Sequence, residues 1–136
     1  MPFVLDASIA ACWAFPDEQD PRANAALTRI RIEDALVPSL WWFEVRNILV
    51  VNERRKRITE ASTNSFLREL ERLRIRMDRE PEEAAVLRLA RAHRLCAHHA
   101  AYLELALREA TPVATLDTEL AAAAVAEGAE LIGATS

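Results

Sequence analysis

The stretch FVLDASIAACWAF, residues 3–15, carries the pattern on which the fold prediction rests. Its first three residues are apolar and the run ends at Asp6, which is typical of a short strand buried within a parallel sheet. Asp6 and Ser8 are residue types that favour the start of a helix, so a helix is expected to follow at once and to reach Phe15.

The rest of the chain repeats this alternation of short apolar stretches and helical patterns. Further strands are expected over residues 35–37, 74–78, 113–116 and 131–132, with 74–78 at a sheet edge because its apolar residues alternate with charges. Helices are expected over residues 22–32, 40–57 (capped by Ser39), 59–73, 81–95, 97–109 and 119–127. This alternation predicts an α/β fold with a parallel sheet, and residues 1–136 are expected to form a single domain.

Composition excludes several functional classes. Only two glycines occur, so neither of the glycine-rich motifs that bind nucleotide phosphates is present. Cys12 and Cys96 are too few for a disulfide framework or a zinc motif, and both are expected to be buried and reduced. No apolar run approaches the roughly 18 residues that cross a membrane, and no signal peptide is recognisable, so a cytoplasmic protein without a membrane partner is expected. The net charge is −4, so any RNA binding depends on a local basic patch or on metal ions.

Three acidic residues are expected to meet at one edge of the sheet. Asp6 and Asp117 each follow a predicted strand, and ligands of α/β sheets bind where the strands' carboxyl ends meet. Glu44 lies one turn into the helix after the second strand, and Asn47 shares its helical face. Converging carboxylates repel one another unless a cation compensates, and hard oxygen ligands suit Mg²⁺ or Mn²⁺. A divalent ion held there can activate water for phosphodiester hydrolysis.

Each of these acids also has a purely structural interpretation. Asp6 and Asp117 can be helix caps and nothing more, and Glu44 can be a solvated helix residue. Bulky apolar residues flank Glu44 and favour a functional role for it: Trp41, Trp42, Phe43 and Val45. From the pattern alone, both interpretations stay open.

The whole chain resembles the PIN-domain family, and in particular its branch of VapC-like toxin ribonucleases. FVLDASIAACWAF is similar to the family's first strand with its D-x-S motif, and VPSLWWFEVRNIL, residues 37–49, is similar to its second motif. HRLCAHHAAYLELALREATPVATLDTELAAAA, residues 93–124, is similar to the long third motif. These motifs cover most of the chain in the family's order and spacing. The resemblance implies a three-layer α/β/α PIN-like domain with a short central parallel sheet.

Carried onto this sequence, the resemblance implies an acidic site that binds Mg²⁺ or Mn²⁺ and cleaves RNA. Asp6, Glu44 and Asp117 match family acids that serve as catalytic residues and metal ligands. Supporting roles fall to three polar residues: Ser8, Asn47 and Thr115.

One position departs from the family's pattern. His99 stands where the family usually has a fourth acid that ligates the metal. Imidazole binds Mn²⁺ or Zn²⁺ but is a poor substitute for oxygen on Mg²⁺. Three interpretations stay open: a working ligand that favours Mn²⁺, a disabling substitution, or an imidazolium that lies against Asp6 and Asp117 in place of the metal. The spacing of His93 and His98 supports no metal site, and both are expected on a helix surface.

Partners are expected from the resemblance and from the surface pattern. Apolar helix faces in excess of one small core suggest a homodimer, and the resemblance implies the same. It also implies a VapB-like antitoxin whose tail covers the acidic cleft. The basic residues that close the long helix either interact with the helix dipole or contact RNA phosphates: Arg54, Arg55 and Arg57.

The sequence therefore predicts a metal-dependent endoribonuclease toxin of a toxin–antitoxin pair. A first alternative, favoured by His99, is a catalytically inactive PIN domain that dimerises and binds an antitoxin. A second alternative is a phosphoacceptor receiver domain, which needs paired acids after the first strand and a late lysine. Asp6 stands alone on its strand and the only lysine is Lys56, so the sequence does not favour the second alternative.

Overall fold

The computed structural model describes residues 1–133, and within them four strands form one sheet. The strands are β1 (Phe3–Leu5), β2 (Ala35–Pro38), β3 (Ile75–Asp78) and β4 (Val113–Ala114), in the order β3-β2-β1-β4. Every neighbouring pair is parallel, with Val4 opposite Leu36 on one side and Val113 on the other. The predicted parallel sheet is confirmed, and β3 lies at its edge as expected.

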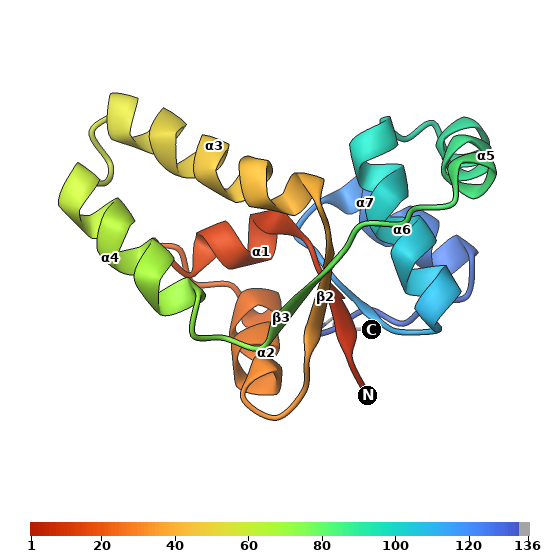
Figure 1. Ribbon diagram of the computed structural model, residues 1–136, viewed down its shortest axis with the longest axis horizontal. Helices are drawn as coiled ribbons and strands as arrows, with labels where there is room; N and C mark the ends of the chain where they lie inside the picture. The colour runs from red at the N-terminus through yellow and green to blue at the C-terminus, as the bar shows by residue number, and fades with distance from the viewer. Residues whose placement is uncertain (134–136) are drawn as a thin grey trace.

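Helices cover both faces of this sheet. They are α1 (Ala7–Cys12), α2 (Pro21–Ile30), α3 (Leu40–Arg54), α4 (Glu60–Leu70), α5 (Glu83–His93), α6 (Ala97–Glu109) and α7 (Thr118–Ala126). Figure 1 shows α1 to α4 on one side of the sheet and α5 to α7 on the other, which gives three layers. No helix within residues 1–133 has both the length and the apolar character needed to cross a membrane.

Burial explains why β1 and α6 lie at the centre of the fold. The three residues of β1 are fully buried because helices cover both faces of the strand. Helix α6 is buried on nearly all sides over residues 100–106, and it packs on β1, β2, α5 and α7. The first turn of α6 and the end of β1 are thereby held in fixed positions.

Several predicted boundaries differ from the structure. The helix expected over residues 40–57 ends at Arg54, because Lys56 adopts a left-handed backbone (φ 60°) that terminates a helix. The helix after β1 ends at Cys12 rather than Phe15, and Ser39 makes no side-chain cap bond to α3. The strand expected over residues 131–132 is a single bridge between Leu131 and Val113.

One prediction about an individual side chain is wrong. Cys96 is exposed rather than buried, because it occupies the N-cap of α6, where its sulfur accepts from the His99 N–H at 3.5 Å. His93 lies in α5 and is half-buried, and its Nε2 lies 2.7 Å from Glu127 Oε2, so that it joins α5 to the end of α7. His98 is exposed, as predicted.

Candidate active site

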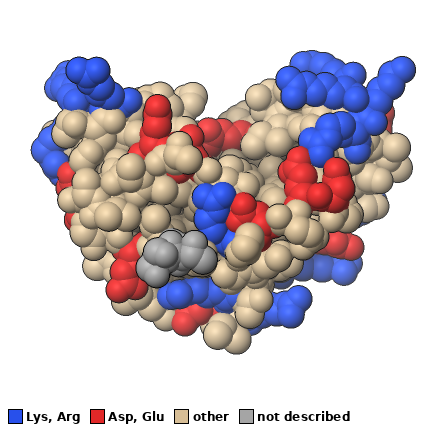
Figure 2. Space-filling model, turned by 180° about the vertical axis from the view of Figure 1, so that it is seen from behind, with Lys and Arg blue, Asp and Glu red and all other residues tan. Residues whose placement is uncertain are grey.

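The carboxyl ends of β1 and β4, the first half of α3 and the first turn of α6 line a cleft of about 370 Å³. All nine lining residues belong to the three sequence motifs: Asp6, Ala7, Ser8, Glu44, Asn47, Ile48, His99, Leu116 and Asp117. Figure 2 shows a notch between the two lobes of the molecule, with carboxylate-bearing residues exposed inside it. The acids predicted to share one edge of the sheet therefore lie around one cleft.

Asp6 is buried at the end of β1 and occupies the N-cap position of α1, but its side chain makes no cap hydrogen bond. Its Oδ2 accepts hydrogen bonds from Ser8 Oγ at 2.7 Å and from Thr115 Oγ1 at 2.6 Å. Its other oxygen, Oδ1, receives no hydrogen bond from any group of residues 1–133. The helix-cap interpretation of Asp6 is therefore wrong, and this carboxylate is oriented by two hydroxyl groups with one oxygen left free.

The same two hydroxyls explain why β4 is shorter than predicted. The Leu116 N–H donates to Ser8 Oγ at 3.1 Å, and the Asp117 N–H donates to Thr115 Oγ1 at 2.9 Å. These backbone donors bond to side chains instead of to a neighbouring strand, so the ladder stops at Ala114. The chain then turns and carries Asp117 to the cleft.

Glu44 is held by Tyr102, a residue that sequence reasoning did not include in the site. The fully buried Tyr102 hydroxyl donates to Glu44 Oε1 at 2.5 Å and accepts from the Ala7 N–H at 3.3 Å. Tyr102 lies three residues after His99 in α6, so the shared face of that helix was the available signal.

Burial and nearby negative charge both raise the pKa values of Glu44 and Tyr102. Burial raises the pKa of Glu44, the nearby Asp6 carboxylate raises it further, and the hydrogen bond from Tyr102 opposes both. Burial also raises the pKa of Tyr102 well above its usual range, with Asp6 and Glu44 contributing. Tyr102 is therefore a neutral hydrogen-bond donor at physiological pH.

Asp117 both caps α7 and lines the cleft. Its Oδ2 accepts from the Leu120 N–H at 2.8 Å, which caps α7 as the structural interpretation predicted. His99 Nδ1 lies 3.6 Å from the same oxygen, so the imidazole faces this acid. Asn47 is exposed at the rim.

The chemistry of the donors suits a divalent cation. Three carboxylates and one imidazole line the cleft, and no lysine or arginine is among the lining residues to neutralise them. Within residues 1–133, however, no three His, Cys, Asp or Glu side chains already converge on one point. Mg²⁺ keeps several of its water ligands in proteins, so acids that reach it through water need not converge.

The basic residues singled out in the sequence lie away from the cleft. Arg54 and Arg55 are exposed at the far end of α3, about 15 Å along the helix from Glu44. Arg57 is committed to contacts within the fold, since it donates to Glu18 at 2.8 Å and to Asn52 at 3.0 Å. Figure 2 shows lysine and arginine gathered at the tips of both lobes, on either side of the notch.

The fold is shared with solved structures. Over 90% of this chain and 84% of the other, it is similar to PAE2754 from Pyrobaculum aerophilum, with a TM-score of 0.70 and 20% identity. Over 96% of this chain and 97% of the other, it is similar to FitAcB from Neisseria gonorrhoeae, with a TM-score of 0.68 and 21% identity. No family model and no curated protein matches the sequence.

These similarities, together with the parallel sheet between two helical layers, give the chain a PIN-like α/β/α fold, as the sequence motifs predicted.

Proposed function

We propose that this protein is a metal-dependent endoribonuclease that acts as the toxin of a toxin–antitoxin pair, similar to VapC. The observation that carries the proposal is the cleft itself. Asp6, Glu44 and Asp117 come from three separate segments and line one cleft, whose lining has no lysine or arginine to balance their charge. Such an arrangement is unfavourable in the absence of a bound cation.

Asp6, Glu44, Asp117 and His99 are the residues that would hold Mg²⁺ or Mn²⁺ here. When bound, the ion would lower the pKa of a coordinated water and neutralise charge on the phosphate. Ser8 and Thr115 fix the orientation of the Asp6 carboxylate, and Tyr102 fixes that of Glu44.

Glu44 is the candidate general base of this site. Its Oε1 accepts from Tyr102, whereas its Oε2 receives no hydrogen bond from residues 1–133, and Glu44 lines the cleft. Burial and Asp6 raise the pKa of Glu44 in the metal-free protein, and a carboxylate with a raised pKa is a stronger proton acceptor. In this role Glu44 would reach the ion through the attacking water rather than directly, and Oε2 would take the proton that this water loses.

RNA is the proposed substrate because exposed arginines on both lobes, at a distance from the cleft, and an exposed aromatic ring near Glu44 can contact an extended strand. Arg54 and Arg55 on one lobe are exposed, and so is Arg91 on the other. These side chains can contact phosphates on either side of the notch, although the chain as a whole is acidic. Trp42, two residues before Glu44, is exposed, and such a ring can stack on an unpaired base.

Two protein partners belong to the same proposal. A second copy of the chain would cover the apolar face of α3, where the large side chains of Phe43 and Val50 are exposed. A VapB-like antitoxin would bind over the acidic cleft and block access to it. Sedimentation of the purified chain, with Phe43→Asp as the variant expected to be monomeric, tests the first partner.

The decisive experiment is an RNA cleavage assay with Mg²⁺, Mn²⁺ or EDTA. The wild type, Asp6→Asn, Glu44→Gln and His99→Asp would be compared, with Glu69→Gln, an exposed acid on α4, as the control. We expect cleavage with Mn²⁺ that is abolished by EDTA, by Asp6→Asn and by Glu44→Gln, and that is unchanged in the control. If cleavage survives EDTA or Asp6→Asn, the proposed site is wrong.

A second candidate function is a catalytically inactive domain that binds an antitoxin. It is favoured by His99, which lies in the cleft beside Asp117 at the position where the family resemblance implies a fourth acid. Cleavage by His99→Asp alone would support it. A receiver domain gains no support, because Lys56 lies at the far end of α3, away from Asp6.

A further inference from the structure

His99 brings an imidazole into a cleft whose other titratable side chains are carboxylates. It lies in the first turn of α6, and its side chain is 27% exposed. Its backbone N–H donates to the Cys96 sulfur, but neither nitrogen of the ring makes a hydrogen bond with residues 1–133. The ring nitrogens are therefore free to bind a ligand in the cleft.

The separation of His99 and Asp117 suits one metal ion between them. His99 Nδ1 lies 3.6 Å from Asp117 Oδ2, which is longer than the roughly 3.2 Å limit of an N–H···O hydrogen bond. Two donor atoms that each lie about 2.1 Å from a common transition-metal ion can be up to about 4.2 Å apart, so these two atoms can bind the same ion as they stand. The Leu120 N–H donates to Asp117 Oδ2 at 2.8 Å and holds this carboxylate in place.

Asp6 is a second and independent indication of a cation in this cleft. The residue is 3% exposed, and Ser8 and Thr115 both donate to its Oδ2. Its Oδ1 receives no hydrogen bond from residues 1–133, and no lysine or arginine belongs to the cleft lining. A buried carboxylate oxygen without a partner is unfavourable, and a cation in the cleft would compensate it.

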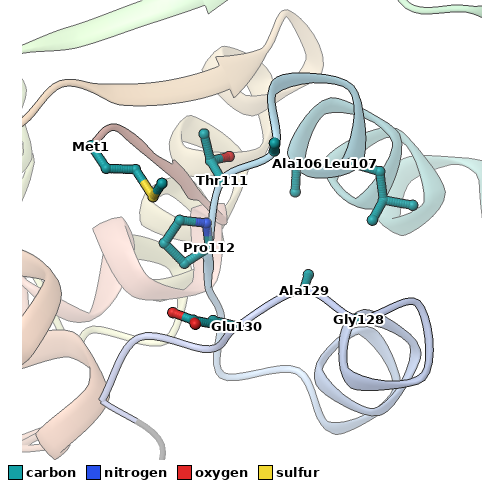
Figure 3. A pocket seen from close by; sticks show the side chains of 9 residues that line it. Met1, Ala106, Leu107, Thr111, Pro112, Gly128, Ala129 and Glu130 are labelled. Carbon is teal, nitrogen blue, oxygen red and sulfur yellow. The ribbon is translucent and has the colours of Figure 1, made fainter.

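Two other places within residues 1–133 lack this combination of free imidazole and unpaired carboxylate. His93 also lies beside an acid, but its Nε2 is 2.7 Å from Glu127 Oε2, and Arg88 lies 4.0 Å from the other oxygen of Glu127. A cavity of about 360 Å³ at the amino ends of the strands contains one carboxylate, that of Glu130, and no imidazole (Figure 3). Met1, which carries the terminal ammonium group, belongs to the same lining.

Nitrogen donors distinguish Mg²⁺ from the transition metals. Mg²⁺ prefers oxygen ligands, whereas imidazole binds transition-metal ions such as Mn²⁺, Co²⁺ and Zn²⁺. We propose that His99 gives this site a preference for a transition-metal ion over Mg²⁺, with His99 Nδ1 and Asp117 Oδ2 as direct ligands. Asp6 and Glu44 compensate the charge of the ion. This inference rests on the metal site of the proposed function and names the class of ion that occupies it.

The ratio of the affinities for Mn²⁺ and Mg²⁺ tests this preference. The metal-free protein would be titrated with Mn²⁺, followed through the electron paramagnetic resonance signal of the free ion, and Mg²⁺ would then be added to displace it. His99→Asp replaces the imidazole with a carboxylate, and His98→Gln, which removes an exposed imidazole outside the lining, is the control. We expect the ratio in the wild type to exceed that in His99→Asp by about tenfold or more, and to be unchanged in the control.

A spectroscopic measurement identifies the ligand without RNA and without catalytic activity. Mn²⁺ bound to an imidazole shows electron spin echo modulation from the ¹⁴N nucleus of the ring. We expect this modulation in the wild type and in His98→Gln, and its loss in His99→Asp. An acid in the first turn of a helix is favourable, so His99→Asp should fold, and circular dichroism would check this.

Two results would overturn the inference and leave the proposed metal site in place. One is an equal ratio of the Mn²⁺ and Mg²⁺ affinities in the wild type and in His99→Asp, with saturable binding that Asp6→Asn weakens. The other is nitrogen modulation that persists in His99→Asp, which would place the ion at another imidazole. A lack of saturable Mn²⁺ binding at about 1 mM would instead overturn both the inference and the metal site on which it rests.

Discussion

Two clusters of acidic side chains contact helix α6, and they differ in whether an arginine of the chain neutralises them. On one face Glu104 lies buried against Arg108, which also contacts Asp78 of β3. On the face toward the cleft, Tyr102 contacts Glu44, with Asp6 nearby and no lysine or arginine in the lining. The buried Glu104 thus has its own arginine, whereas Glu44 and Asp6 have none, which is the arrangement on which the proposed metal site depends.

The first cluster is fully paired. Arg108 Nε lies 2.6 Å from Glu104 Oε2, and its two terminal nitrogens lie 3.1 and 2.8 Å from the two oxygens of Asp78. The guanidinium of Arg108 lowers the pKa of Asp78, and the two carboxylates raise the pKa of Arg108. This network joins the edge strand β3 to α6.

In the second cluster, formed by Tyr102, Glu44 and Asp6, the pKa of the acid Glu44 is shifted in the opposite direction to that of Asp78. Burial and Asp6 raise the pKa of Glu44, whereas Arg108 lowers that of Asp78. Ionised Glu44 therefore reduces the stability of the protein when no cation is bound.

Arg108→Met should destabilise the protein by about 3 kcal/mol, because it leaves the Glu104 carboxylate buried without a partner. Urea denaturation measures the loss. The control is Arg74→Met, which removes an exposed partner of Asp34 and should cost less than about 1 kcal/mol. Equal losses in the two variants would contradict the structural role assigned to the Glu104 cluster.

Thr115→Val should cost about 2 kcal/mol, because Asp6 loses a charge-assisted hydrogen bond and the Asp117 N–H loses its acceptor. Thermal and urea unfolding measure the change. Thr63→Val is the matched control, since the buried Thr63 Oγ1 has no partner within residues 1–133, and its effect should stay within about 0.5 kcal/mol. If both variants behave alike, Thr115 does not orient Asp6.

Tyr102→Phe should cost about 1 kcal/mol, through the lost hydrogen bonds to Glu44 and from Ala7. The same change should raise the pKa of Glu44 further, because the Tyr102 hydroxyl is the group that opposes the rise. Carboxyl NMR titration measures this pKa. An unchanged or lowered value would show that Tyr102 does not stabilise the ionised form.

Glu44→Gln should stabilise the metal-free protein by less than about 1 kcal/mol, since Glu44 is half-buried and solvent screens its charge. An acid whose pKa is raised by folding binds its proton more tightly in the folded state. Wild-type stability should therefore fall as the pH rises from the ordinary glutamate pKa through the raised one, and Glu44→Gln should remove that fall.

Thermal unfolding across this pH range, with EDTA present, gives the measurement for Glu44→Gln. Glu69→Gln is the control and should leave the pH profile unchanged. A profile that is identical in wild type and Glu44→Gln would contradict the assigned pKa shift. A Glu44→Gln variant that is less stable than the wild type without metal would contradict the contrast between the two clusters.

The fold was largely predictable, because local patterns specify where strands and helices begin. The apolar run before Asp6 predicted β1, and Thr59 does cap α4 through its side chain. Helix α6 has the predicted bounds. The boundaries that failed depend on distant groups. Strand β4 is short because Ser8, which is 108 residues away in sequence, takes the Leu116 N–H.

Local periodicity in the sequence specifies the order of strands and helices, the parallel sheet and the edge at which Asp6, Glu44 and Asp117 come together, because near neighbours along the chain set the period of strands and helices. Which acids have a partner depends instead on tertiary packing. Tyr102 reaches Glu44 across 58 residues, and Arg108 reaches Asp78 across 30. Such pairings depend on how α6 packs on the sheet, and no local pattern records that packing.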